Sequence, residues 1–237
     1  MKEFLIEEVS KIGIELTDKQ VEQFMKYYEL LVEWNSFMNL TGITEFEEVV
    51  IKHFVDSLSL VKAVDLSKDL SLIDIGTGAG FPGLPLKIAF PNLKVTLLDS
   101  LNKRIKFLDE VIVQLGLYDI DTIHGRAEDF AKPDKLREKY DLCVSRAVAN
   151  LSTLSEYCLP FVKIDGSFIS YKSEKLSEEL ETAKKAIFIL GGKFDKQIDF
   201  SLDNGNIYRN LVIVKKVQNT PKQYPRKAGT ASKNPII

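Results

Sequence analysis

The chain has 237 residues, of which 45% are hydrophobic and 28% are charged, the balance of a folded globular protein. Its length suits one domain with at most a small appendage. No stretch approaches the roughly 18 apolar residues of a membrane span, and the N-terminal residues lack the apolar core of a signal peptide, so we expect a cytoplasmic protein without membrane contact. The two cysteines, Cys143 and Cys158, have no CxxC spacing, which argues against a disulfide scaffold or a cysteine-based zinc site.

The net charge is only −2, but basic residues gather near the C-terminus. The segment from Lys215 to Ile237 has six basic side chains and no acidic one. A basic tail on an acidic body suggests a local polyanion contact, and we expect Arg226 and Lys227 to bind RNA phosphates. Prolines in the segment predict an extended conformation. The alternative is that the tail packs on the body, with Tyr224 as its anchor.

Helical patterns fill the first part of the chain. Thr17 and Gln20 form a capping-box pattern, and apolar residues recur at helical spacing after it. Thr44 begins a second helical pattern that continues to about residue 61. We therefore predict an N-terminal helical extension over residues 1–65.

Short apolar runs alternate with helical segments from residue 66 onward. Strands are expected at residues 70–75, 94–99, 121–124, 140–145 and 166–171, and helices at residues 103–115, from 127, at 151–161 and at 174–190. This alternation predicts parallel βαβ units in an open sheet with helices on both faces. Two more strand patterns, at 193–200 and 207–217, flank a hairpin signal, so the sheet should finish with an antiparallel strand. The α/β domain is predicted over residues 66–218, followed by a basic tail over 219–237.

The most informative segment is DIGTGAGFPG at residues 74–83, between the first strand and the next helix. Its glycines allow a tight turn and close approach to a nucleotide-like ligand. Gly78, Gly80 and Gly83 form a literal GxGxxG, and Asp99 follows Gly78 by 21 residues, so NAD binding has to be weighed.

Three features favour S-adenosylmethionine (AdoMet) over NAD. Asp74 ends the first strand, where a carboxylate can lie near the ammonium group of AdoMet. The chain finishes with a hairpin instead of a second mononucleotide-binding half, and too few residues remain for a separate substrate domain. An NAD-linked oxidoreductase and a non-catalytic RNA-binding module stay open as alternatives.

Other candidate site residues lie at the ends of the later strands. Asp99 can accept hydrogen bonds from ribose hydroxyls or cap the next helix. Residues 126–129 follow the third strand, where a side chain would flank adenine, although Glu128 also suits the first turn of a helix. Arg146 ends the fourth strand and can present a planar guanidinium to guanine or phosphate. His53 and Asp56 share a helix face that we interpret as hydrogen-bonded and structural.

Seven motifs in this order resemble one family. They are NLT at 39–41, KHFxDS at 52–57, the glycine loop at 74–83, DSxxKR at 99–104, RAE at 126–128, SRA at 145–147 and PRKxG at 225–229. Together they resemble the bacterial 16S ribosomal RNA methyltransferase G family, also called glucose-inhibited division protein B. The resemblance extends from about Leu30 to Pro235. The GFPG ending of the loop at 80–83, the SRA motif and the PRK tail motif are together far more specific than the glycine loop alone.

This resemblance implies a class I AdoMet-dependent methyltransferase fold (Rossmann-like), AdoMet as methyl donor and N7 of one guanine in 16S ribosomal RNA as acceptor. The substrate would be the RNA or the small ribosomal subunit particle, and the chain is expected to be a monomer. The cofactor contacts that the resemblance implies are Gly76, Phe81, Ala127, Glu128 and Arg146. Position in the sequence adds Asp74, Gly78 and Asp99.

The expected chemistry needs few side chains. Guanine N7 has an in-plane lone pair and no proton, so its attack on a methyl group requires no general base. The sequence accordingly has no HExxH metal motif or Ser-His-Asp set, and we expect no metal. Arg146 is the residue expected to contact the substrate as well as the cofactor, and we treat it as the catalytic candidate.

Overall fold

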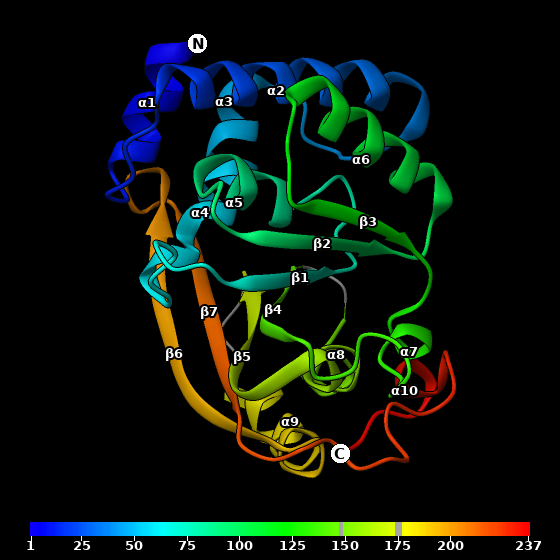
Figure 1. Cartoon of the computed structure of the whole chain (residues 1–237). Coiled ribbons are helices and arrows are strands. Elements are labelled where there is room, and N and C mark those ends of the chain that lie inside the picture. The colour runs from blue at the N-terminus through cyan, green and yellow to red at the C-terminus, as the bar shows by residue number, and fades with distance from the viewer. Residues whose placement is uncertain (147–148, 174–176) are drawn as a thin grey trace.

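A seven-stranded sheet runs through the centre of the computed structural model, which describes residues 1–146, 149–173 and 177–237 (Figure 1). The strands are β1 (Ser71–Ile75), β2 (Lys94–Asp99), β3 (Ile120–His124), β4 (Tyr140–Arg146), β5 (Val162–Lys172), β6 (Gly192–Leu202) and β7 (Ile207–Lys216). Their order is β3-β2-β1-β4-β5-β7-β6; the first five are parallel, and β7 is antiparallel to both β5 and β6. The mostly parallel sheet with an antiparallel final strand is confirmed.

Helices cover both faces of this sheet (Figure 1). On one face lie α1 (Lys2–Ser10), α2 (Asp18–Met38), α3 (Phe46–Val49), a π-helical turn (Val50–Val55), α4 (Asp56–Leu58), a 3-10 turn (Ser59–Lys62), α5 (Gly83–Ala89) and α6 (Asn102–Leu115). On the other lie α7 (Ala127–Phe130), α8 (Leu151–Cys158), α9 (Ser177–Ile189) and α10 (Thr230–Lys233). The expected start of the α9 helix at Glu174 lies outside the described residues.

The longest helix, α2, begins and ends where local chemistry dictates. The Thr17 side chain accepts from the backbone N–H of Gln20, and the Gln20 side chain accepts from the N–H of Thr17, so the predicted capping box is present. Asn39 ends the helix in the left-handed conformation, with φ of 49°.

The N-terminal helices share one hydrophobic core with the sheet. Phe24, Tyr27 and Phe54 are fully buried, and the ring centroids of Phe24 and Phe54 lie 4.9 Å apart. The same cluster continues through Leu84 into the strands. The first 65 residues therefore form part of the wall that supports the sheet, and a second core fills the space between the sheet and α8 and α9.

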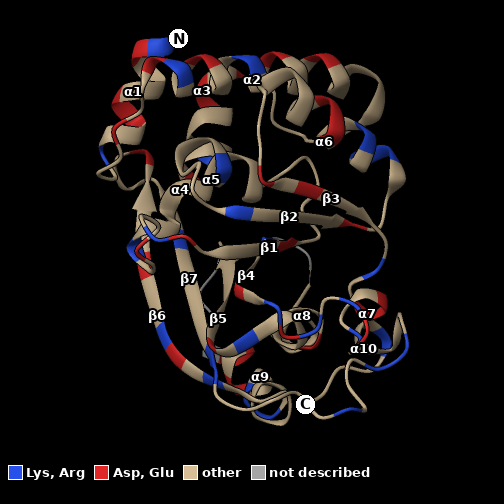
Figure 2. Ribbon diagram, viewed as in Figure 1, with Lys and Arg blue, Asp and Glu red and all other residues tan. Residues whose placement is uncertain are grey.

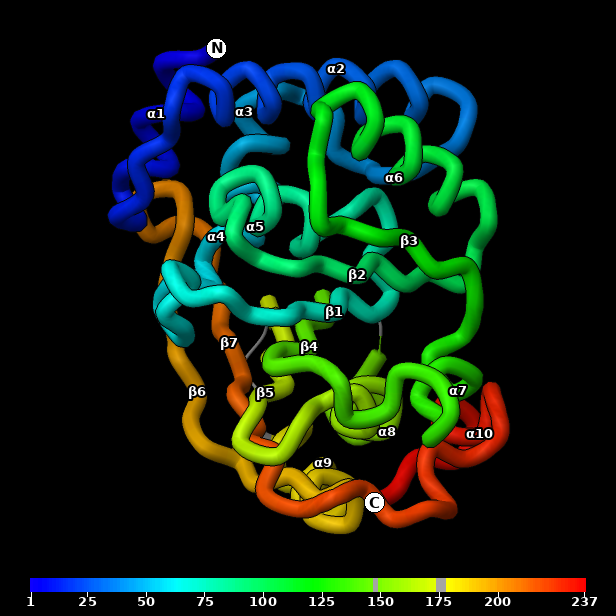
Figure 3. Tube along the Cα trace, in the orientation of Figure 1, coloured from blue at the N-terminus to red at the C-terminus, as the bar shows by residue number. Residues whose placement is uncertain are grey.

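The basic tail folds back on the body beside α7 and α8 (Figures 2 and 3). The Arg226 guanidinium donates to both carboxylate oxygens of Glu156, at 2.7 and 3.0 Å, and Glu156 is only 1% exposed. Arg137 donates to the Tyr224 carbonyl at 2.7 Å, and Tyr224 packs against the second core. The expectation of an extended tail was wrong, because these contacts and α10 fix the segment on the body.

We expect Arg226→Ala to lower the free energy of unfolding by about 3 kcal/mol, because it leaves the buried Glu156 carboxylate without its cation. Lys227→Ala is the matched control: this neighbour is exposed, and its loss should change stability by less than ~0.5 kcal/mol. Urea unfolding of both variants measures the difference. Equal stability of the two would show that the ion pair does not hold the tail.

Candidate active site

The glycine loop between β1 and α5 is closed by one buried carboxylate. Asp74 Oδ2 accepts from the Thr77 hydroxyl at 2.7 Å and from the Gly83 N–H at 2.9 Å, so it joins the two ends of the loop. A Cβ at Gly83 would lie 2.3 Å from Leu97 Cδ2 and 3.1 Å from Asp74 Oδ2, so any larger residue would displace these buried side chains. Burial raises the pKa of Asp74 to about 7. The sequence predicts that Asp74 lies near the cofactor ammonium group. In the structure its Oδ2 binds within the loop, and its buried Oδ1 has no hydrogen-bond partner among the described residues.

Helix α2 supports the same loop from its outer side. The Tyr27 hydroxyl donates to the Ala79 carbonyl at 2.5 Å, and its ring centroid lies 5.5 Å from that of Phe81. Gly80 passes so close that a Cβ would lie 2.9 Å from the Tyr27 oxygen and 2.3 Å from Leu84. The loop is therefore fixed by the N-terminal helices as well as by its own strand.

Asp99, at the end of β2, supports the loop from a third direction. Its carboxylate accepts from the Gly78 N–H at 2.9 Å, from the Leu101 N–H at 2.9 Å and from Arg104 Nη1 at 3.2 Å. It does not cap α6, whose N-cap is Leu101. A carboxylate has about four acceptor positions, so Asp99 can still accept from a ligand hydroxyl.

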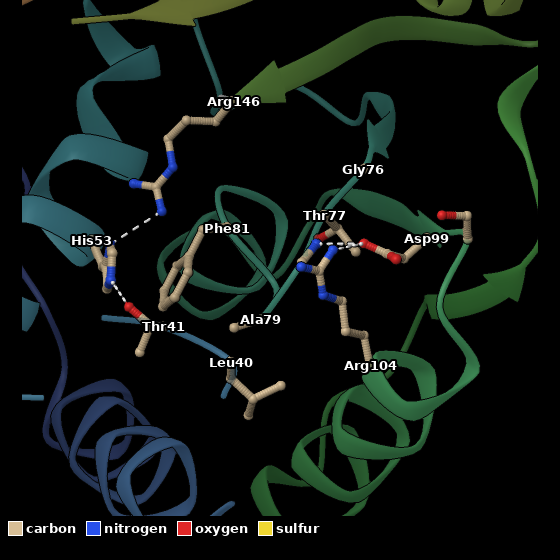
Figure 4. A pocket seen from close by; sticks show the side chains of 12 residues that line it. Leu40, Thr41, His53, Gly76, Thr77, Ala79, Phe81, Asp99, Arg104 and Arg146 are labelled. Atoms are coloured by element: carbon tan, nitrogen blue, oxygen red, sulfur yellow. Dashed lines mark hydrogen bonds and ion pairs between the residues drawn. The ribbon is translucent and has the colours of Figure 1, made fainter. Parts of the chain in front are cut away.

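A hollow of about 370 Å³, here called the loop hollow, lies over the glycine loop (Figure 4). His53 and Arg146 stand at one end of it, and Asp99 and Arg104 at the other (Figure 4). The strand-end hollow, of about 250 Å³, lies over the carboxyl ends of β1, β2 and β3 and shares Gly76 with the first. The two also share Ser100, so they adjoin each other, and together they are here called the trough. The trough lies at the edge of the sheet where ligands bind in open α/β folds.

Seven of the eight predicted cofactor residues line this trough. Gly76, Gly78, Phe81, Asp99 and Arg146 line the loop hollow, and Gly76, Ala127 and Glu128 line the strand-end hollow. Asp74 lines neither. Ala147, the last residue of the SRA motif, lies outside the described residues.

Sequence reasoning missed several lining residues. Thr41, Ser100 and Arg104 belong to motifs that carried the family resemblance, but nothing in their spacing assigned them a place at the cofactor. Tyr157 and Ser232 had no signal at all, because they reach the strand-end hollow only through the fold.

Arg146 is held at the end of β4 by partners from distant segments. Its Nη1 donates to Asp56 Oδ2 at 2.9 Å and to the Lys52 carbonyl at 3.1 Å. Its guanidinium carbon lies 5.0 Å from the centroid of the Phe81 ring, a cation–π contact. Asp56 Oδ1 accepts from Arg209 Nε at 3.2 Å, so one carboxylate positions two arginines.

His53 links the helices to this arginine. Its ring stacks on Phe81 with centroids 4.5 Å apart, its Nε2 lies 2.9 Å from Thr41 Oγ1, and its Nδ1 lies 3.2 Å from Arg146 Nη2. Burial, and then the charge of Arg146, lowers the pKa of His53 to about 3. His53 is therefore neutral at physiological pH, and its hydrogen bonds agree with the polar helix face that the sequence predicted.

The tail contributes to the strand-end hollow. The Gly229 N–H donates to Glu128 Oε1 at 2.8 Å, and Ser232 forms part of the hollow's wall. The tail and the glycine loop are distant in sequence, but the fold brings both to the same edge of the sheet.

The described part of the chain offers neither a metal cluster nor a membrane span. No group of three or more His, Cys, Asp or Glu side chains there could hold a metal ion. Among the same residues, no helix has the length and apolar character needed to span a bilayer.

Comparison with known proteins identifies the chain's family. A family model described as rRNA small subunit methyltransferase G (GidB) matches residues 20–216. The chain belongs to the rRNA small subunit methyltransferase G family. Proteins named Ribosomal RNA small subunit methyltransferase G are 55% identical over 232 residues in Lachnoclostridium phytofermentans (98% of this chain, 96% of that protein) and 52% identical over 236 residues in Acetivibrio thermocellus (100% and 97%).

Solved structures extend this result at the level of the fold. A SAM dependent methyltransferase from Aquifex aeolicus aligns with a TM-score of 0.56 at 18% identity, over 76% of this chain and 97% of its own. TYW2 from M. jannaschii, solved in complex with AdoMet, aligns with a TM-score of 0.53 at 16% identity, over 64% and 71%. The Rossmann-like class I methyltransferase fold is therefore confirmed, and the NAD-linked alternative is not favoured.

The trough offers an elongated space with an open backbone position and a carboxylate along it. Gly78 has φ of 63°, and a Cβ added to it would meet no atom within 4 Å. Because Gly78 lines the loop hollow, such a Cβ would occupy the space available to the ligand. The Asp99 carboxylate is within the same hollow, and the two connected hollows extend beyond the volume of a single base.

Gly78→Ala should therefore weaken AdoMet binding at least about tenfold, or about 1.4 kcal/mol. Gly116→Ala is the matched control, because Gly116 has φ of 59°, open space at its Cβ and a position away from the trough. Both variants carry the same backbone strain, so calorimetric titration with AdoMet isolates the steric effect. Equal affinities would refute the placement of the cofactor over Gly78.

The raised pKa of Asp74 predicts a pH dependence of stability. Between pH 3.8 and about pH 7 the folded chain holds a proton that the unfolded chain has lost, so this group's contribution falls as the pH rises through that window. His53 acts in the opposite direction over much of the same window, because its folded pKa is lowered. Only a difference between variants therefore isolates the contribution of Asp74.

The free energy of unfolding of Asp74→Asn, minus that of the wild type, should increase with pH across this window by up to ~1.4 kcal/mol per pH unit. The amide carbonyl of the substituted side chain can still accept from Thr77 and Gly83, so the loop stays closed. Denaturant unfolding at several pH values gives the difference. A constant difference would mean that Asp74 is already ionised in the folded chain at acidic pH.

Proposed function

We propose that this chain transfers a methyl group from AdoMet to N7 of a guanine in 16S ribosomal RNA, presented as RNA or as a small ribosomal subunit particle. The observation that carries the proposal is the trough at the strand ends. Arg146 lines both the loop hollow of this trough and a second hollow next to it. Membership of the rRNA small subunit methyltransferase G family, and relatives with that name over nearly their full length, support it.

The cofactor's adenosine would lie in the strand-end hollow, against Ala127 and Glu128, with its ribose hydroxyls donating to Asp99. The amino-acid end would lie over Gly76 and Gly78, where the backbone approaches closely. When bound, AdoMet supplies an electrophilic methyl group. The chain's own contribution is to hold that group at the end of the trough next to Arg146.

The acceptor side needs orientation more than proton transfer. Guanine N7 carries no proton, and neutral His53 is not required as a base. Holding N7 in line with the methyl group can lower the barrier by roughly 7–11 kcal/mol through orientation alone. Arg146 is suited to this positioning, since Asp56 and the Lys52 carbonyl fix its guanidinium.

The RNA backbone would meet the basic side chains outside the trough. Lys227 is exposed and remains our candidate for a phosphate contact. Arg226 is also kept as a candidate, although its guanidinium is paired with Glu156 and so has fewer donors for RNA. Replacing Lys227 should flatten the salt dependence of RNA binding by about one unit or less.

The direct test is to incubate the protein with methyl-labelled AdoMet and small ribosomal subunit particles that lack the modification, and to map the labelled nucleotide. Label at N7 of one guanine in 16S ribosomal RNA supports the proposal. Label elsewhere, or none with a folded protein that binds AdoMet, would overturn it.

We expect Arg146→Ala to lower both the single-turnover rate of methylation at saturating AdoMet and the affinity for AdoMet. The fold-loss in rate should exceed the fold-loss in affinity by at least about tenfold. The reason is that Arg146 borders both the cofactor side and the open space beyond it. Thermal unfolding serves as the control, because the variant also removes one of the two cations on Asp56. Normal single-turnover rates in a folded variant would exclude the substrate role.

A further inference from the structure

A third hollow, here called the arginine hollow, adjoins the loop hollow at His53 and Arg146. Its volume is about 240 Å³, and it shares these two side chains with the loop hollow. Lys172 and Arg209, from the ends of β5 and β7, line this hollow and not the trough. A ligand in it would therefore lie next to the methyl-donor side, with His53 and Arg146 at the border.

The polar groups of the arginine hollow are mainly donors. Lys172 Nζ is 2.6 Å from Glu179 and donates to the Ala149 carbonyl at 3.1 Å, so its charge is largely balanced. The two arginines, in contrast, share the single carboxylate of Asp56, which is 3% exposed. The hollow therefore has an excess positive charge and fixed guanidinium groups.

Arg146 retains donors for a ligand. A guanidinium has five N–H groups, and the contacts of Arg146 with Lys52, Asp56 and His53 involve at most three of them among the described residues. The Arg209 Nε is held by Asp56 at 3.2 Å, so its planar group is also positioned before any ligand arrives.

The size of the hollow limits what it can take. Pockets for drug-sized ligands have about 300–1,000 Å³, so the 240 Å³ here suit a single base. The N7 edge of a paired guanine lies in the deep, narrow major groove of A-form RNA, which side chains cannot reach. An enzyme that acts on a base therefore takes it unpaired into a pocket.

We infer that the arginine hollow binds the acceptor guanine as an unpaired base, with O6 accepting from the guanidinium donors and N7 facing the loop hollow past Arg146. This inference rests on the proposed function. O6 and N7 lie on the same edge of guanine, and both are acceptors. An arginine on the wall between the hollows can bind O6 while the neighbouring N7 stays free to react.

The same arrangement selects against adenine. Adenine has an amino donor in place of O6, and this group would meet the guanidinium donors. Hypoxanthine keeps O6 and N7 but lacks the 2-amino group, so it separates recognition at O6 from recognition at the opposite edge. We expect GMP and IMP to bind, and AMP to bind much more weakly.

The first experiment titrates the protein, saturated with S-adenosylhomocysteine, with GMP, IMP and AMP in a calorimeter. GMP and IMP should bind with similar affinity and at least about tenfold more tightly than AMP. Equal affinity for AMP and GMP, or loss of IMP binding, would overturn the inference. This readout does not depend on methyl transfer.

The second experiment uses Arg209→Gln and Lys172→Gln, since both residues line the arginine hollow alone. Arg209→Gln should weaken GMP binding and raise the KM for RNA at least about tenfold, with AdoMet affinity unchanged, and Arg209→Lys should recover part of the loss. Lys193→Gln is the matched control, because Lys193 is an exposed cation on the neighbouring strand β6. Should Arg209→Gln fail to fold, Lys172→Gln carries the test, with a smaller loss expected.

The outcomes separate the inference from the proposed function. A wild-type protein that methylates no guanine in small-subunit particles would overturn the function. The inference would be overturned, and the function kept, by a different pair of results. The wild-type protein would methylate the guanine, and folded variants of Arg209 and Lys172 would keep the wild-type KM for RNA and the preference for GMP.

Discussion

The site depends on how one short stretch of backbone is held open. The glycine loop must turn between β1 and α5 without a side chain on its ligand face, so its polar groups need partners from elsewhere. Asp74 closes the loop from behind, Asp99 binds the Gly78 N–H, and Tyr27 binds the Ala79 carbonyl. These three supports come from β1, β2 and α2. The loop thus keeps its shape before a ligand arrives, which reduces the ordering needed for binding.

This support explains why the N-terminal helices belong to the functional unit. Tyr27 and Phe54 pack beneath Phe81, and His53 stacks on the same ring. Phe81 in turn lies under the guanidinium of Arg146. The N-terminal helices therefore position both Phe81 at the floor of the trough and Arg146 at the end of the trough. A change in the packing of these helices would shift both residues, because the aromatic side chains between them are in contact.

Local patterns predicted most of the fold. The strands and the hairpin were readable because apolar runs stop at glycines and turn residues, and the capping box at Thr17 is a local hydrogen-bond pattern. The glycine loop and Arg146 could be placed because strand ends meet at one edge of a parallel sheet. The π-helical turn at residues 50–55 was not predictable, since its hydrogen-bond pattern departs from the periodicity that sequence reading uses.

Contacts between distant segments account for what could not be predicted. Asp56 accepts hydrogen bonds from Arg146 and Arg209, which lie 90 and 153 residues away in the sequence. No local sequence pattern predicts contacts between residues so far apart. In the tail, charge alone suggested a free cationic strand, because Glu156, the partner of Arg226, is 70 residues distant. Asp74 was placed on the correct strand end, but its hydrogen bonds to Thr77 and Gly83 within the loop could not be predicted, because they depend on the direction of the side chain.

The position of Gly229 also has a consequence for biosynthesis. Its bond to Glu128 joins residues 101 apart, and Ser232 completes the same wall. The wall of the strand-end hollow is therefore complete only after the end of the chain has been synthesised and has packed on the body. If this hollow holds the nucleoside as proposed, affinity for the cofactor should arise late in the maturation of the newly made protein.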